Sequence, residues 1–289
     1  MAGGKAAGSI TWLASYPKSG NTWVRALLSS YLAGGTYDLS INHLVAPYVT
    51  AGRSILEEHL GVESSDLLPI EIERLRPRVY KLAASKAAEP LIWKTHDAWR
   101  LTDRGESLFP ACVCGPAVYI ARNPLDVAVS FANHQGWSLE NTVRAMSNPE
   151  YCLRGDRYSA RGQLYEFLGR WDDHVRSWLE QNELDVMLVR YEDLHADPFS
   201  AFTAVLLHLK IPVERKKVAL AIEQSSFRHL RAQEEQAGFT GKNPAGGRFF
   251  RRGEIGAWRD ELASELVEQL QRDHGEVMAR LGYADIKLA

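Results

Sequence analysis

The chain has 289 residues, 45% of them hydrophobic and 24% charged, and its formal net charge is −2. This balance is typical of a soluble globular protein and gives no sign of a nucleic-acid partner or of an acidic membrane surface as a partner. No apolar run approaches the roughly 18 residues of a membrane span, so we expect no membrane partner. The length allows one large α/β domain or two small ones.

Residues 1–9 are rich in glycine and alanine and predict a flexible lead-in, too short and too weakly apolar for a signal peptide. The three cysteines, Cys112, Cys114 and Cys152, cannot all pair within one chain. No histidine-rich sequence completes a zinc-binding spacing around them. We therefore expect unpaired thiols, a reducing cytoplasm as the location and no metal site.

The first predicted strand–turn–helix unit carries a turn of small and polar residues. An apolar run over residues 10–14 predicts a buried strand, and residues 24–32 predict a helix. Unpaired N–H groups at the helix start, together with the helix dipole and the charge of Lys18, favour a bound anion there. Further side-chain donors in the turn come from Ser19, Asn21 and Thr22. The turn therefore predicts a phosphate or sulfate site.

The order of Lys18 and Gly20 separates this turn from the common nucleotide-binding loop. The Walker pattern places a glycine upstream and then Gly-Lys-Ser/Thr, whereas here Lys18 precedes Gly20 and no glycine lies earlier in the turn. An ordinary turn with one surface lysine is the plain alternative. The anion site is favoured because several polar donors surround one glycine and an aromatic residue, Trp23, follows within one helical turn.

The next segments lead to a second polar strand end. Residues 37–69 predict loops and short helices, and residues 70–86 predict a helix that Pro77 kinks or divides. A short apolar strand then ends in Lys94-Thr95-His96. In open α/β sheets, functional residues gather outside the carboxyl ends of the strands. A lone histidine more often caps a strand, so position alone favours function and packing about equally.

Residues 117–121 form the clearest buried strand, and a cation follows directly. Arg122 offers a bidentate fork that suits a phosphate, and Pro124 fits the first turn of a helix. Ser130, two turns into that helix, adds a hydroxyl donor. The remaining patterns predict a strand over residues 185–191 followed by a turn at 192–194, and helices over 139–146, 164–178, 199–209, 216–231 and 262–281.

A glycine-rich stretch and a basic, aromatic segment stand near the C-terminus. Residues 237–247 contain four glycines and a proline, which predict a mobile loop, and residues 248–258 follow with three arginines. Clustered arginines usually form a solvated surface run. A flexible hinge that leads into Arg251-Arg252-Gly253 is also how a lid closes over an anionic ligand.

Three separated segments resemble the cytosolic-type sulfotransferases. Residues 16–23 (YPKSGNTW) look like the 5′-phosphosulfate loop of that family, and residues 119–130 (YIARNPLDVAVS) look like its 3′-phosphate motif. Residues 250–258 (FRRGEIGAW) resemble its C-terminal Arg-Lys-Gly-x-x-Gly-x-Trp motif. The Lys-Thr-His strand end and the segment RYED at 190–193 also follow in family order, so the resemblance spans roughly residues 10–283. Several motifs in order are more specific than any one.

The resemblance implies a single sulfotransferase domain over residues 10–289, with a P-loop-like three-layer α/β fold in which helices flank a central parallel sheet. It implies 3′-phosphoadenosine 5′-phosphosulfate (PAPS) as co-substrate, the bisphosphate PAP as product and a small-molecule acceptor. The residues implied to bind the donor are Lys18, Ser19, Gly20, Asn21 and Thr22 at the 5′-phosphosulfate, Trp23 on the adenine, Arg122 and Ser130 at the 3′-phosphate, Arg251, Arg252 and Gly253 closing over it, and Tyr191, Ser225 and Phe227 at the adenosine.

The chemistry of the implied reaction agrees with these residue types. Sulfuryl transfer moves an SO₃ group in line from a phosphate oxygen to an acceptor oxygen or nitrogen, so it depends mainly on positioning and charge stabilisation. Lys18 can neutralise the bridging oxygen as its bond to sulfur breaks. His96, which matches the catalytic base, can take the proton of the acceptor hydroxyl, and Lys94 matches the strand lysine beside it. The reaction needs no metal.

Some positions depart from the family pattern. Asn21 stands where threonine is usual, and Arg252 replaces a lysine, which keeps the charge but changes its geometry. Ala257 replaces an aspartate often found before the tryptophan. The family's C-terminal dimer motif of Lys, Thr-Val and Glu is not evident after Trp258, which leaves the oligomeric state open.

Two other functions stay open at this point. A P-loop kinase or NTPase shares the strand–loop–helix logic, and a non-catalytic PAP-binding protein would keep the cradle without the reaction. The acceptor is unidentified and could be a phenol, an alkyl alcohol, a peptide antibiotic or an amine. Its pocket walls are expected in residues 37–69, 97–110, 132–160 and 232–249, with aromatic candidates at Tyr37, Trp99, Phe131, Trp137, Phe239 and Phe249, each equally compatible with ordinary packing.

Overall fold

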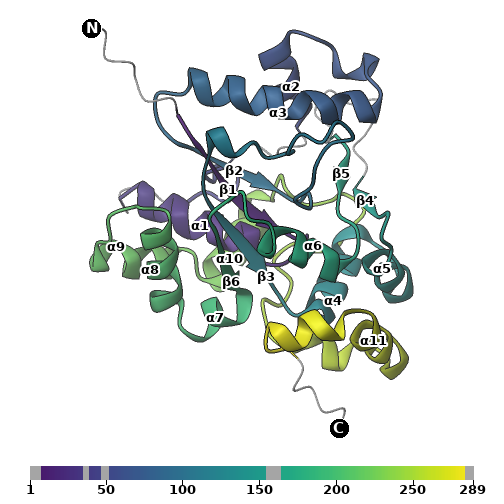
Figure 1. Ribbon diagram of the computed structural model, residues 1–289. Coiled ribbons are helices and arrows are strands. Elements are labelled where there is room, and N and C mark those ends of the chain that lie inside the picture. Colours follow the sequence, from purple (N-terminus) through teal and green to yellow (C-terminus); the bar gives the residue numbers. More distant parts are fainter. Residues whose placement is uncertain (1–7, 35–38, 47–51, 154–163, 284–289) are drawn as a thin grey trace, which may run out of the picture.

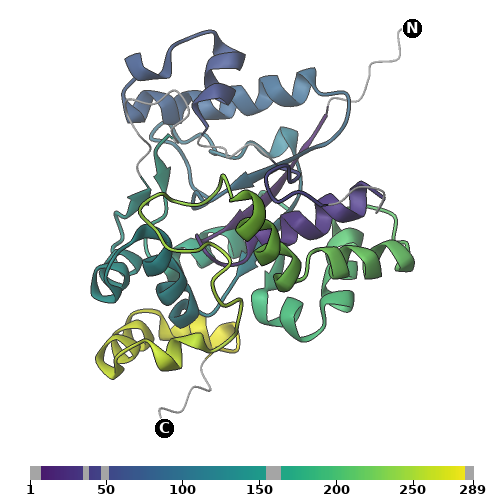
Figure 2. The same ribbon diagram turned by 180° about the vertical axis from the view of Figure 1, so that it is seen from behind.

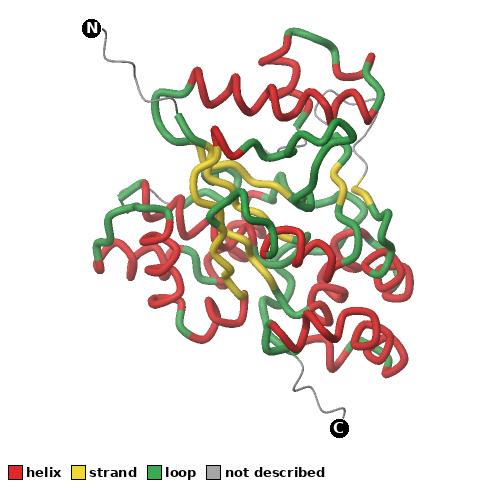
Figure 3. Tube along the Cα trace, in the orientation of Figure 1, coloured by secondary structure: helices red, strands yellow, loops and turns green. Residues whose placement is uncertain are grey.

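A computed structural model describes residues 8–34, 39–46, 52–153 and 164–283. Four parallel strands form a central sheet in the order β2-β1-β3-β6. These strands are β1 (Ile10–Ser15), β2 (Leu91–Thr95), β3 (Cys114–Ala121) and β6 (Val186–Arg190). Helices surround the sheet on both sides, as Figures 1 and 3 show. The predicted three-layer α/β fold with a central parallel sheet is confirmed.

Alternation along β1 explains why two separate cores form. Trp12 and Ala14 pack into the core on one face of the sheet, whereas Leu13, between them, packs into the core on the other. Because both faces are covered, the strand reads as a continuous apolar run in the sequence. The first core includes α2 (Arg53–Leu60), α3 (Pro69–Lys86), α4 (Pro124–Gln135), α5 (Leu139–Met146), α6 (Trp171–Leu179) and α11 (Ser264–Arg280). The second includes α1 (Asn21–Leu32), α7 (Tyr191–Ala196), α8 (Pro198–His208) and α9 (Arg215–Gln224).

The helix expected over residues 164–178 begins later than the sequence pattern indicated. Residues 166 and 167 form β5 (Glu166–Phe167), which pairs antiparallel with β4 (Cys152–Leu153). Gly169 then adopts a left-handed backbone (φ +62°), and α6 starts at Trp171. The apolar residues that suggested one helix therefore belong partly to a strand and partly to a helix, and both elements pack against the core.

The helix expected over residues 216–231 is two helices. Helix α9 ends at Gln224, and α10 (Phe227–Ala237) begins after Ser226, whose backbone is extended (φ −61°, ψ 146°). The turn expected at 192–194 is part of the short helix α7. Helix α3 runs through Pro77 as one element. Short 3₁₀ turns complete the described elements: η1 (Ser64–Asp66), η2 (Ala111–Val113) and η3 (Ala257–Asp260).

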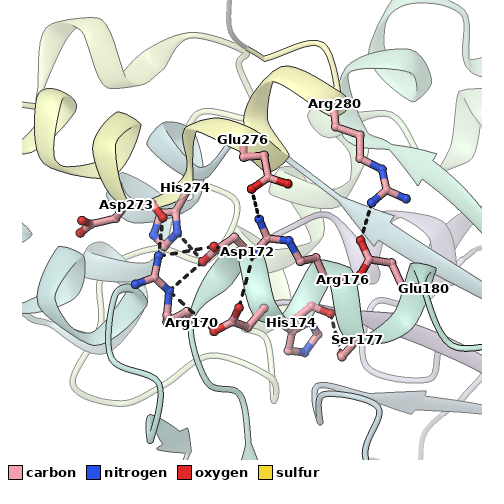
Figure 4. Close-up of polar contacts among 11 residues, drawn as sticks. Arg170, Asp172, His174, Arg176, Ser177, Glu180, Asp273, His274, Glu276 and Arg280 are labelled. Carbon is pink, nitrogen blue, oxygen red and sulfur yellow. Dashed lines mark hydrogen bonds and ion pairs between the residues drawn. The ribbon is translucent and has the colours of Figure 1, made fainter.

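A buried ionic cluster joins the last helix to α6; we call Arg170, Asp172, Arg176 and His274 the α6–α11 cluster (Figure 4). Asp172 accepts hydrogen bonds from Nδ1 of His274 (2.7 Å) and Nε of Arg170 (3.0 Å), and it pairs with Arg176 (3.2 Å). Arg176 also reaches Glu276 on α11 (2.9 Å). The cluster therefore fixes α11 against the sheet-covering helix α6 with paired charges.

The remaining expectations concern undescribed residues, membrane-spanning helices and the cysteines. Residues 1–7 of the expected flexible lead-in and the aromatic candidate Tyr37 lie outside the described residues. Within the ranges that the structure describes, no helix is both long and apolar enough to cross a bilayer. Cys112, Cys114 and Cys152 are free thiols.

Candidate active site

The turn after β1 is shaped by two residues with left-handed backbones, Lys18 (φ +67°) and Gly20 (φ +106°). A Cβ atom at Gly20 would lie 2.7 Å from Cδ2 of Tyr191, so only glycine fits at this close approach. Helix α1 begins immediately afterwards at Asn21. The carbonyl of Gly20 accepts the N–H groups of Trp23 (2.9 Å) and Val24 (3.2 Å), so the helix has no earlier turn to pair with the N–H groups before them. The turn is therefore a cradle of backbone donors at a helix start.

A cavity of about 870 Å³ opens at the carboxyl ends of the strands. Almost every residue predicted for the site contributes to its wall: Lys18, Gly20, Asn21, Thr22, Trp23, Lys94, His96, Arg122, Ser130, Tyr191, Ser225, Phe227, Arg251, Arg252 and Gly253. Ser19 is fully buried and does not reach the wall. The side-chain amide of Asn21 donates away from the turn, to the carbonyl of Leu13 (2.9 Å) and to Oγ of Ser15 (3.2 Å). The structure thus brings together segments that lie far apart in the sequence.

Lys18 is held in an environment that disfavours its charge. Burial, followed by the nearby charges of Arg122 and Lys94, lowers the pKa of Lys18 to about 7, and Glu234 acts weakly in the opposite direction. The Nζ atom lies 3.5 Å from the centre of the Phe249 ring. No carboxylate pairs with Lys18 among the described residues. An anion in the cavity would therefore restore the charged form.

The imidazole ring of His96 is oriented by its hydrogen bond to the backbone oxygen of Ser15. Its Nδ1 lies 2.7 Å from the backbone oxygen of Ser15, and a carbonyl oxygen can only accept, so Nδ1 carries the proton. The lone pair is then on Nε2, and His96 lines the cavity. Burial, and after it the charge of Lys94, holds the pKa of His96 well below its usual range. The neutral imidazole that a general base requires is therefore the stable form near neutral pH.

The backbone of His96 is fixed by residues that the sequence did not reveal. Nε2 of His174 donates to its carbonyl (2.9 Å), and the hydroxyl of Tyr119 bonds Nδ1 of His174 (2.8 Å). Oε1 of Glu166 accepts the N–H of His96 (3.3 Å). Burial raises the pKa of Glu166, whereas Lys94 lowers it and is itself favoured in its charged form by Glu166. Glu166, which is not part of the cavity wall, therefore interacts with both Lys94 and His96.

A second part of the cavity wall, next to the turn, is built around Arg122, whose Nη1 lies 3.5 Å from the carbonyl oxygen of Lys18. Its guanidinium lies 4.3 Å from the centre of the Tyr191 ring, and Nη2 donates to the carbonyl of Glu254 (2.8 Å). The Tyr191 hydroxyl donates to the carbonyl of Gly253 (2.9 Å). Gly253 has a left-handed backbone (φ +69°), and a Cβ there would come within 2.2 Å of the ring of Phe227. These contacts draw the predicted residues from four elements into one corner.

Polar atoms without partners surround this cavity. Oδ1 of Asn21, Oγ of Ser225 and Nε of Arg122 are buried and make no hydrogen bond within the described part of the chain, and all three residues line the cavity. Buried polar groups are otherwise almost always satisfied, because leaving one unpaired costs about 1–3 kcal/mol. Three such atoms around one cavity are the pattern expected of a site that a polar ligand completes.

The segment after α10, residues 238–256, crosses the cavity; we call it the C-terminal strap. In Figure 2 it is the yellow-green loop that passes over the middle of the molecule. The carboxylate of Glu234 accepts the N–H groups of Phe249 (2.7 Å) and Phe250 (2.8 Å). Asn133 on α4 exchanges hydrogen bonds with the backbone of Gly247 and Arg248 (both 3.0 Å). The strap is therefore anchored on both sides of the cavity.

The two strap arginines predicted to close over the ligand are paired with carboxylates. Arg251 makes a bidentate pair with Glu261 (2.7 and 2.9 Å), and Arg252 pairs with Glu254 and Asp260 (both 2.8 Å). The pairs involving Arg252 are largely exposed, so they hold its side chain only weakly. Both arginines line the cavity.

The expected aromatic walls divide into two groups. Phe131, Phe239 and Phe249 line the cavity, whereas Trp99 and Trp137 lie outside its wall. Among the described residues, no group of His, Cys, Asp or Glu side chains is arranged to hold a metal ion. Besides Glu166, His174 and Glu234, the sequence interpretation missed Arg25, which lines the cavity from α1. Its position one helical turn after Asn21 was the available signal.

Comparison with known proteins agrees with this architecture. The family model described as the sulfotransferase domain matches residues 9–282. The amine sulfotransferase of Oryctolagus cuniculus is 23% identical over 274 residues, which cover 91% of this chain and 79% of that protein. Cytosolic sulfotransferase 8 of Arabidopsis thaliana is 26% identical over 269 residues, which cover 89% and 73%. The crystal structure of mouse sulfotransferase SULT7A1 complexed with PAP has the same fold, with a TM-score of 0.60, 19% identity and coverage of 96% and 89%.

Proposed function

The chain belongs to the sulfotransferase domain family, and on that premise we propose that its cavity binds PAPS and transfers the sulfuryl group to a hydroxyl group, less readily an amine, of a small molecule. One observation carries the proposal. Lys18 and the unprotonated Nε2 of His96 belong to the same cavity, beside polar atoms that have no hydrogen-bond partner among the residues that the structure describes. An activated sulfuryl group between them would have a cation on its leaving side and a base on its accepting side.

The residues around the cavity fit a donor with an anion at each end. For the first anion, the turn at Lys18–Gly20 offers backbone donors and a lysine for which the described residues provide no carboxylate partner. For the second anion, Arg122 and the hydroxyl of Ser225, which is unpartnered among the described residues, lie beside the aromatic rings of Tyr191 and Phe227. Cationic and aromatic groups in this order suit a 3′-phosphorylated adenosine. The rings supply flat surfaces for the base, and the arginine suits the phosphate.

Each residue then has a defined task. Bound PAPS supplies a sulfuryl group on a phosphate leaving group. Nε2 of His96 takes the proton of the acceptor hydroxyl as its oxygen bonds to sulfur, and the bond from sulfur to the bridging phosphate oxygen breaks. Lys18 stabilises the charge that develops on that oxygen, and Lys94 adds positive charge beside the reacting groups. His174 and Glu166 keep the backbone of His96 in place.

The decisive experiment combines binding with turnover. We expect the protein to bind PAP without a metal, and to add 80 Da, the nominal mass of SO₃, to at least one member of a panel of phenols, alkyl alcohols and amines incubated with PAPS. Mass spectrometry measures the products, and isothermal titration calorimetry measures PAP and Mg·ATP binding. Binding of Mg·ATP in preference to PAP would replace this proposal with a kinase or NTPase. Tight PAP binding with no product from any acceptor would make the protein a non-catalytic PAP-binding protein.

Three further properties accompany this proposal. The match of the family model over residues 9–282 supports one sulfotransferase domain over residues 10–289. The name of the Arabidopsis relative, a cytosolic sulfotransferase, supports a cytoplasmic location. The acceptor is proposed to be a small molecule because the cavity, at about 870 Å³, holds the donor and one compact second ligand.

A further inference from the structure

We infer that Arg25 forms a carboxylate-binding subsite in the acceptor part of the cavity, so that the natural acceptor carries a carboxylate as well as the hydroxyl group that is sulfated. This inference rests on the proposed function, because it assigns the chemical class of the acceptor for the same cavity. It depends on the position of Arg25, on its lack of an acidic partner and on the distribution of charge around it.

Arg25 projects from the side of α1 that faces the strand ends. Asn21, one helical turn earlier, donates to the carbonyl of Leu13 and to Oγ of Ser15, which places this side of α1 over the end of β1. Arg25 lines the cavity, as do Lys94 and His96. Its charge also lowers the pKa of Lys94, so the two cations are close. The guanidinium therefore belongs to the part of the cavity that contains the base.

Arg25 has no acidic partner in the described part of the protein. Its Nε donates to the backbone oxygen of Val45 (2.9 Å), and no carboxylate is paired with its remaining N–H groups. Burial alone lowers the pKa of Arg25 to about 10. By contrast, the buried Arg76 is neutralised by Asp97 through two hydrogen bonds (3.1 and 2.5 Å). A partly buried arginine without a counter-charge is costly unless a ligand supplies one.

The charges around the cavity leave Arg25 without a role toward the donor. The wall contains seven Lys or Arg residues and only two acidic ones, Asp126 and Glu254, although the whole chain has a net charge of −2. Both acidic residues have partners, since Asp126 accepts the N–H groups of Gly256 and Trp258 and Glu254 pairs with Arg252. Lys18 and Arg122 are assigned to the two anionic groups of the donor, and the charge of Lys94 is opposed by that of Glu166. Arg25 remains as an uncompensated cation.

The neighbouring wall suits an amphiphilic acceptor with one anionic end. Ile41 and Leu44 line the cavity together with Asn42, in the segment whose Val45 carbonyl holds Nε of Arg25. The fork of N–H groups left on the guanidinium matches the two oxygens of a carboxylate. An acceptor whose hydroxyl reaches Nε2 of His96 and whose apolar body lies along this wall would then place a carboxylate at Arg25.

The test measures binding to the PAP-loaded protein, so it does not depend on turnover. The ligands are 4-hydroxybenzoate, 4-hydroxyphenylacetate and 3-(4-hydroxyphenyl)propionate, each compared with its neutral amide by isothermal titration calorimetry. We expect at least one carboxylate to bind about tenfold more tightly than its amide, the preference to disappear in Arg25→Gln, and Arg25→Lys to restore part of it. The control variant Arg78→Gln changes an exposed arginine on α3 and should keep the full preference.

Two outcomes overturn the inference. One is that no carboxylate binds wild-type protein more tightly than its amide. The other is that Arg25→Gln weakens PAPS binding about tenfold and leaves the carboxylate-to-amide ratio unchanged, which would assign Arg25 to the sulfuryl group of the donor. Failure of the proposed function has a different signature, namely no PAP binding by wild-type protein. In that case the carboxylates and their amides are compared on the protein without PAP. A preference for the carboxylate that disappears in Arg25→Gln would still support the subsite. Circular dichroism checks that each variant is folded.

Discussion

Charged side chains are paired in one polar region of the molecule and unpaired in another. In the α6–α11 cluster, Arg170, Arg176 and His274 all face the carboxylate of Asp172 at hydrogen-bond or ion-pair distance. In the cavity, Lys18 faces an aromatic ring and other cations, and Arg25 faces a single carbonyl oxygen. One region is complete within the protein, whereas the other requires an anion from outside.

The pKa values follow this difference. Although burial raises the pKa of Asp172, the hydrogen bonds from His274 and Arg170 outweigh it and hold that pKa well below its usual range. No such partner opposes burial at Lys18, whose pKa falls to about 7. A buried group stabilised in its charged form strengthens the fold, and a buried group driven toward neutrality weakens it. Unpaired cations of the second kind gather where a ligand binds.

The largest effect is expected when the base itself is removed. In His96→Asn the new side-chain amide can still donate to the carbonyl of Ser15, but no lone pair is left at the position of Nε2. Because a positioned general base contributes about 10²–10⁴-fold, we expect kcat for sulfuryl transfer to fall about 10³-fold with PAP affinity unchanged. His59→Ala, on α2 and outside the cavity wall, serves as the control. Near-normal kcat in His96→Asn would exclude His96 as the base.

Lys18 is proposed to stabilise the charge that develops on the leaving phosphate oxygen. We expect its removal to lower kcat about 10²–10³-fold, as for other groups that stabilise developing charge. In Lys18→Met this loss should come without a loss of folding stability, because the variant removes a buried cation for which the described residues offer no acidic partner. Equilibrium unfolding in urea measures the stability. A large destabilisation would show that Lys18 contributes to the fold rather than to the reaction.

The lowered pKa of Lys18 also predicts a proton effect on binding. Above pH 7 the free protein holds Lys18 mainly neutral, and an anion beside it favours the charged form. Binding of PAP at pH 8 should therefore take up close to one proton at this site, and affinity should fall as pH rises through 7. Titration calorimetry in buffers of different ionisation enthalpy measures the uptake, which Lys18→Met should abolish. Proton release at pH 8 would contradict the assignment.

The paired cluster should show the opposite behaviour. Asp172→Asn removes the charge that Arg170, Arg176 and His274 share, and we expect it to lower the free energy of unfolding by about 2 kcal/mol. PAP affinity and kcat at a permissive temperature should stay unchanged, since the cluster lies outside the cavity wall. Glu180→Gln breaks the exposed pair with Arg280, also shown in Figure 4, and should cost less than about 0.5 kcal/mol. Equal losses in the two variants would remove the distinction between buried and exposed pairs.

The same contrast explains which features the sequence could predict. The strand ends that carry Lys18, His96 and Arg122 were identified because each follows an apolar run directly, and parallel strands bring such ends to one edge of the sheet. The break at Ser226 was missed because the apolar period continues across it.

Glu166 and Glu234 were missed because their roles depend on which segments meet in space. The neighbours of Glu166 in the chain do not indicate that its carboxylate accepts the N–H of His96, 70 positions earlier. Likewise, the sequence of α10 does not show that Glu234 anchors the strap. Tertiary contacts of this kind leave no local pattern.

The smallest effect is expected for Glu166, which has two roles. Its carboxylate accepts the N–H of His96, a contact within the protein, and its charge favours the protonated form of Lys94 in the cavity. In Glu166→Gln the amide oxygen can still accept the N–H of His96, but the charge that favours protonated Lys94 is lost, and Asp97 remains paired with Arg76. The pKa of Lys94, already lowered by burial, should fall further, so less of it is charged at any pH above the new value. We expect kcat to fall about tenfold at pH 8 and to recover toward pH 6, where His96 is still neutral because its pKa is also lowered.

The control Glu73→Gln removes a buried carboxylate that pairs with Arg100 outside the cavity wall, and it should not shift the pH profile of kcat. A loss in Glu166→Gln that is the same at every pH would show that Glu166 acts only through the backbone of His96.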